Sequence, residues 1–142
     1  MAYNILIVDD SIPMRAVLKK TIQASGFNVG EIFEASDGGE ALEVMRREWM
    51  DVVVSDYNMP EMNGLEMLAE MKKDEVLRSV PVVMVTTEGS RERIDLFMRM
   101  GVTDYVKKPF TPEEVRSKLD RILGEDEDGQ GPVDDDDEGL DF

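Results

Sequence analysis

Acidic side chains stand at the ends of two short apolar runs in this 142-residue sequence. Asp9 and Asp10 follow the run at residues 5–8, and Asp56 ends the run that begins at Asp51. If the fold brings these three carboxylates together, they raise one another's pKa unless a cation is present. Oxygen ligands without histidine or cysteine favour a hard ion, and Mg²⁺ typically binds one or two carboxylates while leaving room for phosphate oxygens. The pattern therefore predicts a Mg²⁺ site.

The same residues could carry out phosphoryl transfer, because an ionised aspartate can attack phosphorus and become an aspartyl phosphate. We expect Asp56 to be this nucleophile. Thr86 ends a further apolar run and Lys108 follows the last one. Their hydroxyl and ammonium groups would neutralise charge on the phosphoryl oxygens. The chain contains no histidine, so the phosphoryl donor must be another molecule, either a kinase phosphohistidine or a small phosphodonor.

These side chains must be positioned by alternating strands and helices. Apolar runs rich in β-branched residues predict strands at residues 5–8, 31–35, 51–56, 80–86 and 104–107. A helical pattern follows each run, with start signals at Ser11, Asp37, Ser90 and Thr111 and stop signals at Gly26 and Gly101. The side chains expected on buried helix faces are Met14, Val17, Leu18, Ile22, Ala41, Leu42, Met45, Trp49, Leu65, Leu68, Met71, Val115, Leu119 and Ile122.

This (βα)5 order predicts a doubly wound α/β fold, in which helices cover both faces of a parallel five-stranded sheet. Connections between the strands should be right-handed. We expect the flavodoxin-like strand order 2-1-3-4-5, which makes the first and third strands neighbours. Asp9, Asp10, Asp56, Thr86 and Lys108 would then converge at the carboxyl end of the sheet.

Each of these residues also has an ordinary structural explanation. The Asp9–Asp10 pair could simply favour the amino end of a helix, and Asp56 could form a turn. Thr86 and Lys108, taken singly, are more often structural or solvated than functional. Their coincidence at four strand ends favours the phosphoryl-transfer interpretation.

Four motifs, VDDS-x-x-x-R, SDYNMPEMNG, VVMVTTE and DYVKKPF, resemble the receiver domains of two-component signalling over roughly residues 3–123. The resemblance is strongest to the single-domain chemotaxis regulators of the CheY type, which are themselves an example of the rule that open α/β sheets bind ligands at the carboxyl ends of their strands. It implies that Asp10 and Asp56 bind Mg²⁺ directly and that Asp9 holds it largely through water. The backbone carbonyl of Asn58 is implied as a further ligand.

The resemblance also assigns roles around the phosphoryl group. It implies that Thr86 and Lys108 contact this group, that Tyr105 rotates inward on activation, and that the Lys108–Pro109 bond is cis. Asn58 and Glu88 match positions that modulate dephosphorylation in chemotaxis regulators. Thr87 departs from the usual alanine, glycine or serine, and we expect it to crowd the mouth of the pocket.

By this resemblance the protein is a phosphorylation-dependent switch, not a turnover enzyme. A histidine kinase would phosphorylate Asp56, and the product would bind a target such as the flagellar motor switch, with a phosphatase as a further candidate partner. A phosphorelay intermediate or a phosphate sink is the alternative. A metal-dependent phosphohydrolase fits less well, because those enzymes place the nucleophile on the first strand with a second acid two residues later.

Charge and composition narrow the function classes further. The formal net charge of −16 argues against nucleic-acid binding, and no stretch approaches the roughly 18 apolar residues of a membrane helix. The absence of cysteine fits a reducing compartment, and we expect a cytoplasmic protein. Separately, we expect a monomer. Residues 125–142 hold ten acids and no bases, which leaves 22 acids and 16 bases in residues 1–124. We expect a receiver domain at 1–124 and a disordered acidic tail at 125–142.

The tail has a plain interpretation as a solubilising extension. Its acids together with Leu140 and Phe142 also resemble the segments by which chemotaxis partners bind the face made by the fourth helix, fifth strand and fifth helix. We therefore consider that the tail docks on its own domain or on another copy. The basic residues expected on that face are Arg93, Arg99, Lys107, Lys118 and Arg121.

Overall fold

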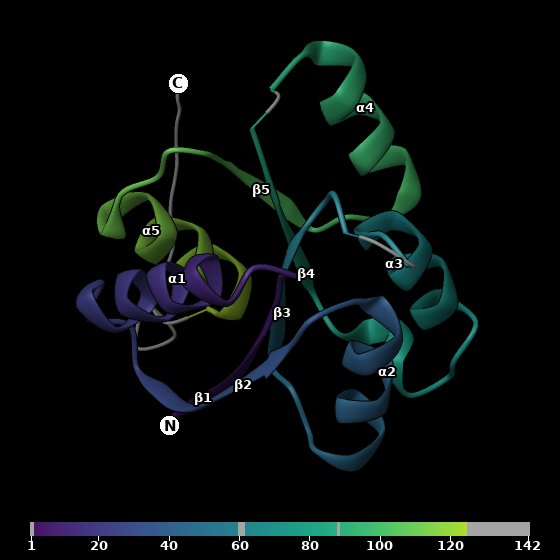
Figure 1. The fold of residues 1–142 in the computed structure, drawn as a ribbon, viewed down its shortest axis with the longest axis horizontal. Helices are drawn as coiled ribbons and strands as arrows, with labels where there is room; N and C mark the ends of the chain where they lie inside the picture. Colours follow the sequence, from purple (N-terminus) through teal and green to yellow (C-terminus); the bar gives the residue numbers. More distant parts are fainter. Residues whose placement is uncertain (1, 60–61, 88, 125–142) are drawn as a thin grey trace.

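Strands and helices alternate along the chain in the computed structural model, which describes residues 2–59, 62–87 and 89–124 (Figure 1). The strands are β1 (Tyr3–Val8), β2 (Val29–Ala35), β3 (Val52–Asp56), β4 (Val82–Thr86) and β5 (Asp104–Lys107). The α-helices are α1 (Ile12–Ala24), α2 (Gly38–Arg47), α3 (Gly64–Lys72), α4 (Arg91–Met100) and α5 (Pro112–Leu123), and a 3-10 helix, η1 (Leu77–Ser79), precedes β4.

The strands form one parallel sheet in the order β2-β1-β3-β4-β5, which confirms the predicted flavodoxin-like topology. Helices α1 and α5 cover one face, and α2, α3 and α4 cover the other (Figure 1). The register sets Val8 beside Ser55 and Thr86 beside Lys107. Because all strands point the same way, the segments that follow β1, β3, β4 and β5 meet at one edge of the sheet.

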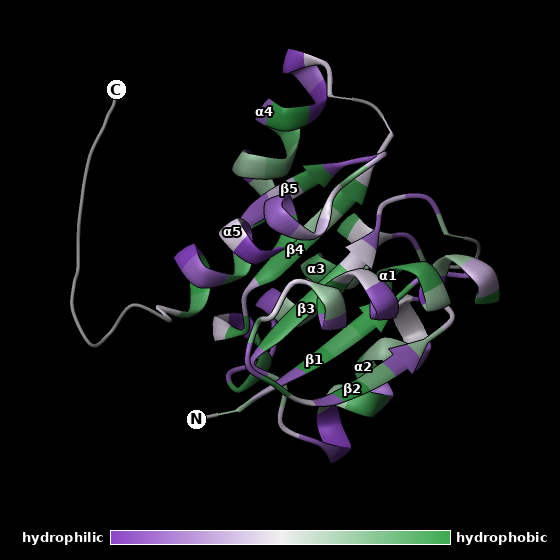
Figure 2. Ribbon diagram, turned by 90° about the vertical axis from the view of Figure 1, so that its left-hand side faces the viewer, coloured by the Kyte–Doolittle hydropathy of each residue, from purple (hydrophilic) through white to green (hydrophobic). Residues whose placement is uncertain are grey.

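Apolar side chains fill the space on both faces of the sheet, and Figure 2 shows the strands as the hydrophobic centre of the molecule. Successive residues of a strand point to opposite faces. In β1, Ile5 and Ile7 belong to the core beneath α1 and α5, whereas Leu6 and Val8 belong to the core beneath α2, α3 and α4. A strand buried on both faces therefore shows an unbroken apolar run.

The helix starts follow the predicted caps. Ser11, Asp37, Ser90 and Thr111 each accept a hydrogen bond from a backbone N–H in the first turn of the helix that follows. Such a bond satisfies one of the N–H groups that a helix start leaves unpaired. At the end of α4, Gly101 adopts a φ of 98°, a left-handed conformation that glycine accepts without the usual steric cost.

Two side chains predicted to be buried are exposed. Trp49 lies beyond the end of α2 at Arg47, with 59% of its surface exposed, and its indole N–H donates to Asp51. Val17 is 48% exposed, because the buried stripe of α1 passes through Leu18 and Ile22 and leaves Val17 at its margin. Strand boundaries also shift by two residues: β1 starts at Tyr3 and β4 at Val82.

The Lys108–Pro109 peptide bond is cis, as expected. None of the helices within the described ranges has the length and the apolar stretch needed to cross a bilayer. The acidic tail at residues 125–142 and Glu88 lie outside the described residues. The domain boundary after residue 124 and the role of Glu88 therefore stay predictions.

Candidate functional site

Three carboxylates meet at the carboxyl edge of the sheet. One oxygen from each of Asp9, Asp10 and Asp56 lies within 4.8 Å of the others. Asp9 and Asp10 directly follow β1, and Asp56 is the last residue of β3, the strand paired with β1. Asp9 is almost fully buried, with 1% exposure, whereas Asp10 is exposed. The fold thus brings together the three acids that the sequence singled out.

Burial and nearby negative charge disfavour the charged forms of Asp9 and Asp56. Burial is the main cause that raises the pKa of Asp9, and the charge of Asp56 adds to it, although the Ser11 N–H hydrogen bond opposes the shift. Burial likewise raises the pKa of Asp56 against the lowering effect of Lys108. The buried Oδ2 atom of Asp9 has no hydrogen-bond partner among the residues that the structure describes. An oxygen cluster of this kind is favourable for a hard divalent cation.

Lys108 brings a positive charge to the cluster. Its Nζ atom lies 3.4 Å from Oδ1 of Asp56, and both side chains are largely buried. The Lys108 backbone N–H donates to the Thr86 carbonyl at 2.8 Å, which fixes the chain where it leaves β5. The lysine therefore reaches across β4 to the end of β3.

The other predicted site residues lie on β4, on β5 and in the segment after β3. Thr86 is the last residue of β4 and is 3% exposed, so it ends at the same edge of the sheet as Asp56. Asn58 is exposed in the segment between β3 and α3. Tyr105 is half-buried on β5 and is not part of the carboxylate cluster; the Lys118 ammonium lies 5.0 Å from its ring centroid.

Thr87 is exposed immediately after β4. It lines a groove of about 370 Å³ between the start of α1 and the loop before α5. The other residues lining this groove are Met14, Val17, Lys108, Pro109 and Phe110. Thr87 thus shares a groove with Lys108, while its effect on access to the pocket stays a prediction.

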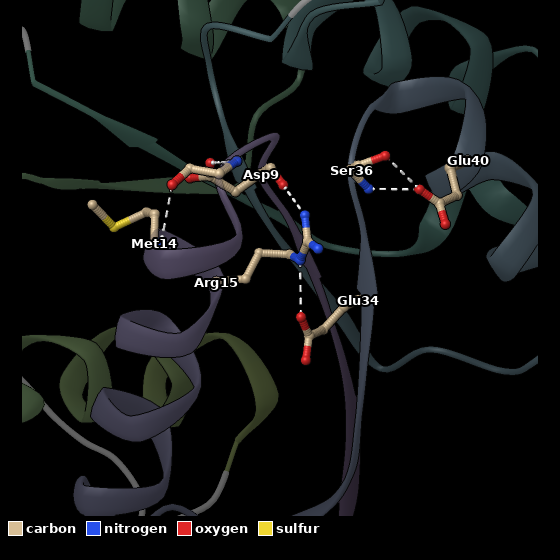
Figure 3. Close-up of polar contacts among 7 residues, drawn as sticks. Asp9, Met14, Arg15, Glu34, Ser36 and Glu40 are labelled. Carbon is tan, nitrogen blue, oxygen red and sulfur yellow. Dashed lines mark hydrogen bonds and ion pairs between the residues drawn. The ribbon is translucent and has the colours of Figure 1, made fainter.

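Arg15 is a residue of the site region whose contacts the sequence did not reveal. Its guanidinium donates one hydrogen bond to the backbone carbonyl of Asp9 and another, at 2.8 Å, to the Glu34 carboxylate on β2 (Figure 3). The side chain is only 14% exposed. Arg15 ties the end of β1 to both α1 and β2. The arginine of the VDDS-x-x-x-R motif was the available signal, but the motif did not show its partners.

The loop after β2 is fixed in a comparable way. One oxygen of Glu40 accepts hydrogen bonds from the Ser36 hydroxyl and the Ser36 N–H, each at 2.7 Å (Figure 3). These bonds lower the pKa of Glu40 because they stabilise its charged form. The contact holds the loop that leads into α2 close to the edge of the sheet where β1 ends.

Tyr57, the residue after Asp56, packs against side chains of α4. The Arg93 guanidinium lies 4.3 Å from the centroid of the Tyr57 ring, and the Phe97 ring centroid lies 5.5 Å from it. A cation over an aromatic face and a tilted ring pair are both favourable contacts. Tyr57 therefore packs against two side chains of α4, contacts that the sequence alone did not predict.

Comparisons with known proteins place this arrangement among signalling domains. The family described as "Response regulator receiver domain" matches residues 5–120. A chemotaxis protein CheY homolog from Campylobacter jejuni is 38% identical over 122 residues, covering 85% of this chain and 92% of its own length. Chemotaxis protein CheY-3 from Vibrio cholerae is 42% identical over 120 residues, covering 84% and 91%. The structure of Vibrio cholerae CheY4 matches with a TM-score of 0.78 at 36% identity, covering 87% of this chain and 100% of that one.

Proposed function

The chain belongs to the response regulator receiver domain family, and on that premise we propose that it is a chemotaxis-type switch whose Asp56 accepts a phosphoryl group. Receiver domains of this type act in two-component signalling as switches and in general are not turnover enzymes. The observation that carries the proposal is the grouping of three carboxylates within 4.8 Å, with the Lys108 ammonium 3.4 Å from Asp56.

Receiver domains bind Mg²⁺ at an acidic pocket, and the residues of this chain fit such an ion. Asp9, Asp10 and Asp56 supply carboxylate oxygens, and the Asn58 carbonyl is the further ligand that we assign. The fit rests on the buried Asp9 Oδ2 atom, which has no hydrogen-bond partner within the described part of the chain. When bound, Mg²⁺ neutralises negative charge on the carboxylates and the phosphoryl oxygens.

The chain's own residues then carry the transfer. An Asp56 carboxylate oxygen forms a bond to phosphorus as the bond between phosphorus and the imidazole nitrogen of the donor breaks, and the released imidazole takes a proton from water. No general base is needed, because the ionised carboxylate has no proton to lose. The Lys108 ammonium and the Thr86 hydroxyl stabilise the negative charge of the transferring group from two further strands.

We next assign the partners of the protein. The chain contains no histidine, so the phosphoryl donor is another molecule, and we assign this role to a histidine kinase. The phosphorylated protein binds a target such as the flagellar motor switch through the face formed by α4, β5 and α5, where Tyr105 reports the state of the site. We assign the protein to the cytoplasm as a monomer.

Beryllofluoride, which mimics a bound phosphoryl group, tests the acceptor assignment. We expect ¹⁹F signals of bound beryllofluoride only when Mg²⁺ is present, and none with Asp56→Asn. Asp95→Asn, an exposed aspartate on α4, serves as the matched control and should behave as the wild type. Binding that survives Asp56→Asn would remove the basis of the proposal.

The activated protein then distinguishes two downstream functions. Capture of a motor switch protein by the beryllofluoride form supports the output switch. Capture of a second histidine phosphotransferase instead would identify a phosphorelay intermediate.

A further inference from the structure

A groove of about 480 Å³ lies beside β5, between the loop after β4 and the first half of α5. It combines apolar side chains, Tyr105, Val106 and Pro109, with the cationic side chains of three lysines. Its lining residues are Gly89, Tyr105, Val106, Lys107, Lys108, Pro109, Glu114 and Lys118. A ligand that fits it would carry both negative charge and apolar groups.

The groove has more positive than negative charge. Lys107 is exposed and has no carboxylate partner in the ranges that the structure describes. Lys118 and Arg121 share a single carboxylate, that of Asp104, at 3.0 and 3.2 Å. The Glu114 carboxylate is already engaged, because it accepts the Thr111 backbone N–H at 2.9 Å. An excess of cations is unusual on a chain whose formal net charge is −16.

The chain itself carries a segment of complementary chemistry. Residues 134–138 are five consecutive acids, and Leu140 and Phe142 follow them. We propose that residues 134–142 bind in this groove on their own domain, with the acids against Lys107 and Lys118 and the apolar side chains against Tyr105 and Pro109.

The distance along the chain permits this contact. The groove reaches Glu114 and Lys118 on α5, and from Glu114 to Gly124 the rise of a helix amounts to about 15 Å. The ten residue-to-residue steps from Gly124 to residue 134 span up to about 33 Å when extended. The acidic run can therefore turn back along α5 and reach the groove.

Tethering makes a weak intrinsic affinity sufficient. A segment joined to its site by a short linker of adequate reach has an effective concentration of the order of millimolar. Exposed ion pairs are individually weak and are screened by salt. The bound tail should therefore be substantially populated at low ionic strength and displaced at high ionic strength.

Occupation of the groove would cover Tyr105 and the lysines beside it. Any acidic protein segment that binds there would first have to displace the tail. This inference rests on the groove and the tail composition, so it stands or falls independently of the phosphorylation chemistry of Asp56.

A spin label on the tail of the full-length protein tests the inference directly. The chain has no cysteine, so Gly139→Cys gives a single attachment site. Without Mg²⁺ or phosphodonor at low salt, we expect the backbone amide signals of Gly89, Val106 and Lys107 to lose at least half of their intensity. Signals of Asn4 and Trp49 should be unaffected, and high salt should restore the groove signals. Unchanged groove signals, or equal losses over the whole surface, would overturn the proposal.

Two charge reversals identify the contact. Lys107→Glu should restore the groove signals at low salt, because it places an acid where the tail needs a cation. Lys73→Glu reverses another exposed lysine, at the end of α3, and should leave the losses unchanged. Equal effects of the two variants would show that only overall charge matters, and this would contradict the proposal.

Mixing separates binding within one chain from binding between copies. Isotope-labelled protein without the spin label is combined with spin-labelled protein that carries no isotope label. We expect no loss of intensity at the groove. A loss as large as in the protein that carries both labels on one chain would mean that the tail docks on a second copy, and the proposal for its own domain would be wrong.

Discussion

At the scale of single residues, the chemistry of Asp56 depends on what surrounds it. Alone, a strand-end aspartate is a common turn residue. Here it stands within 4.8 Å of two other carboxylate oxygens, and an ammonium group lies 3.4 Å away. Burial raises the pKa of Asp56, while the positive charge of Lys108 acts in the lowering direction. These opposed effects act on the carboxylate that we propose as the nucleophile, in a cluster of oxygens that favours a cation.

Lys108 should contribute to phosphoryl transfer but not to Mg²⁺ binding. Replacing it by methionine removes a positive charge that stabilises the transferring group, and loss of one such stabilising donor typically lowers a rate about 100- to 1000-fold. Mg²⁺ affinity should be unchanged or higher, because a cation beside the carboxylates is gone. Rates of labelling by acetyl phosphate and Mg²⁺ titrations measure the two effects. Lys107→Met, at the exposed neighbouring position, is the control, and an equal loss of rate there would refute this role.

Asp9 should destabilise the metal-free protein at neutral pH. Its pKa is raised in the folded state, so the ionised form costs stability, and this cost disappears as the pH falls through the raised pKa. In EDTA, Asp9→Asn should therefore unfold at higher urea concentration than the wild type at pH 7. The difference should shrink as the pH approaches 4. A less stable variant at pH 7 would contradict the electrostatic account.

Magnesium should reverse that order. An ion that binds only the folded state stabilises it by about 2.7 kcal/mol at a concentration of 100 times Kd. The wild type should gain this stability, and Asp9→Asn should gain less because it has lost one carboxylate. Urea unfolding with and without Mg²⁺ gives both values. Equal gains in the two proteins would exclude Asp9 from the ion site.

At the scale of elements, the site depends on how neighbouring segments are held in register. Arg15 on α1 joins the Asp9 carbonyl at the end of β1 to Glu34 on β2. The sequence contains this arginine in a recognisable motif, but its two partners are separated along the chain and become neighbours only through strand pairing. Periodicity predicts that a helix exists and where its caps lie. It does not predict such links between elements.

Arg15→Met should weaken Mg²⁺ binding although Arg15 does not itself belong to the carboxylate cluster. Groups that hold metal ligands in place are typically worth 10- to 100-fold in affinity, and we expect about the lower figure, since only the backbone of Asp9 is held. Arg116→Met is a matched control, because Arg116 also pairs with a carboxylate, that of Asp120 on α5. Mg²⁺ titration of both variants at equal ionic strength decides the matter. Identical affinities would show that Arg15 is purely structural.

Gly64 allows α3 to start close to the end of β3. A Cβ atom at this position would lie 2.7 Å from the Met84 sulfur and 2.9 Å from the Asp56 carbonyl oxygen. Gly64→Ala should therefore cost about 1–3 kcal/mol in unfolding free energy, the usual range for overpacking. Gly39→Ala is the control, because a Cβ atom there meets only the Asp37 side chain at 3.3 Å. Urea unfolding should show no comparable loss for Gly39→Ala, and similar losses would rule out crowding as the cause.

At the scale of the whole molecule, the sequence predicted the sheet, its strand order and the edge where the acids meet. Apolar periodicity predicts the strands and helices, and their alternation predicts a parallel sheet, but the strand order comes from the flavodoxin-like fold class and not from periodicity. Trp49 was misplaced because helical periodicity continues past the residue at which α2 ends. Val17 was misplaced because the buried stripe of α1 is narrower than its apolar positions. The Arg93 contact with Tyr57 could not be foreseen, since it depends on how α4 packs against the segment after β3.

The molecule also combines two opposed charge distributions. A body with 22 acids and 16 bases carries a groove rich in lysine, and residues 125–142 add ten acids without a base. Whether the tail occupies the groove would govern access to Tyr105, whereas the carboxylate cluster lies at the ends of β1 and β3. Phosphorylation at Asp56 and the access of partners to the groove at Tyr105 would then be separate properties of one chain.

The central claim, that Asp56 is the phosphoryl acceptor of a Mg²⁺-dependent site, is tested most directly by mass spectrometry of the intact protein after incubation with acetyl phosphate. We predict one added phosphoryl group in the wild type and in Asp95→Asn, dependent on Mg²⁺ and abolished by EDTA. We predict none in Asp56→Asn. Equal labelling of Asp56→Asn and the wild type, or labelling that persists in EDTA, would contradict the account.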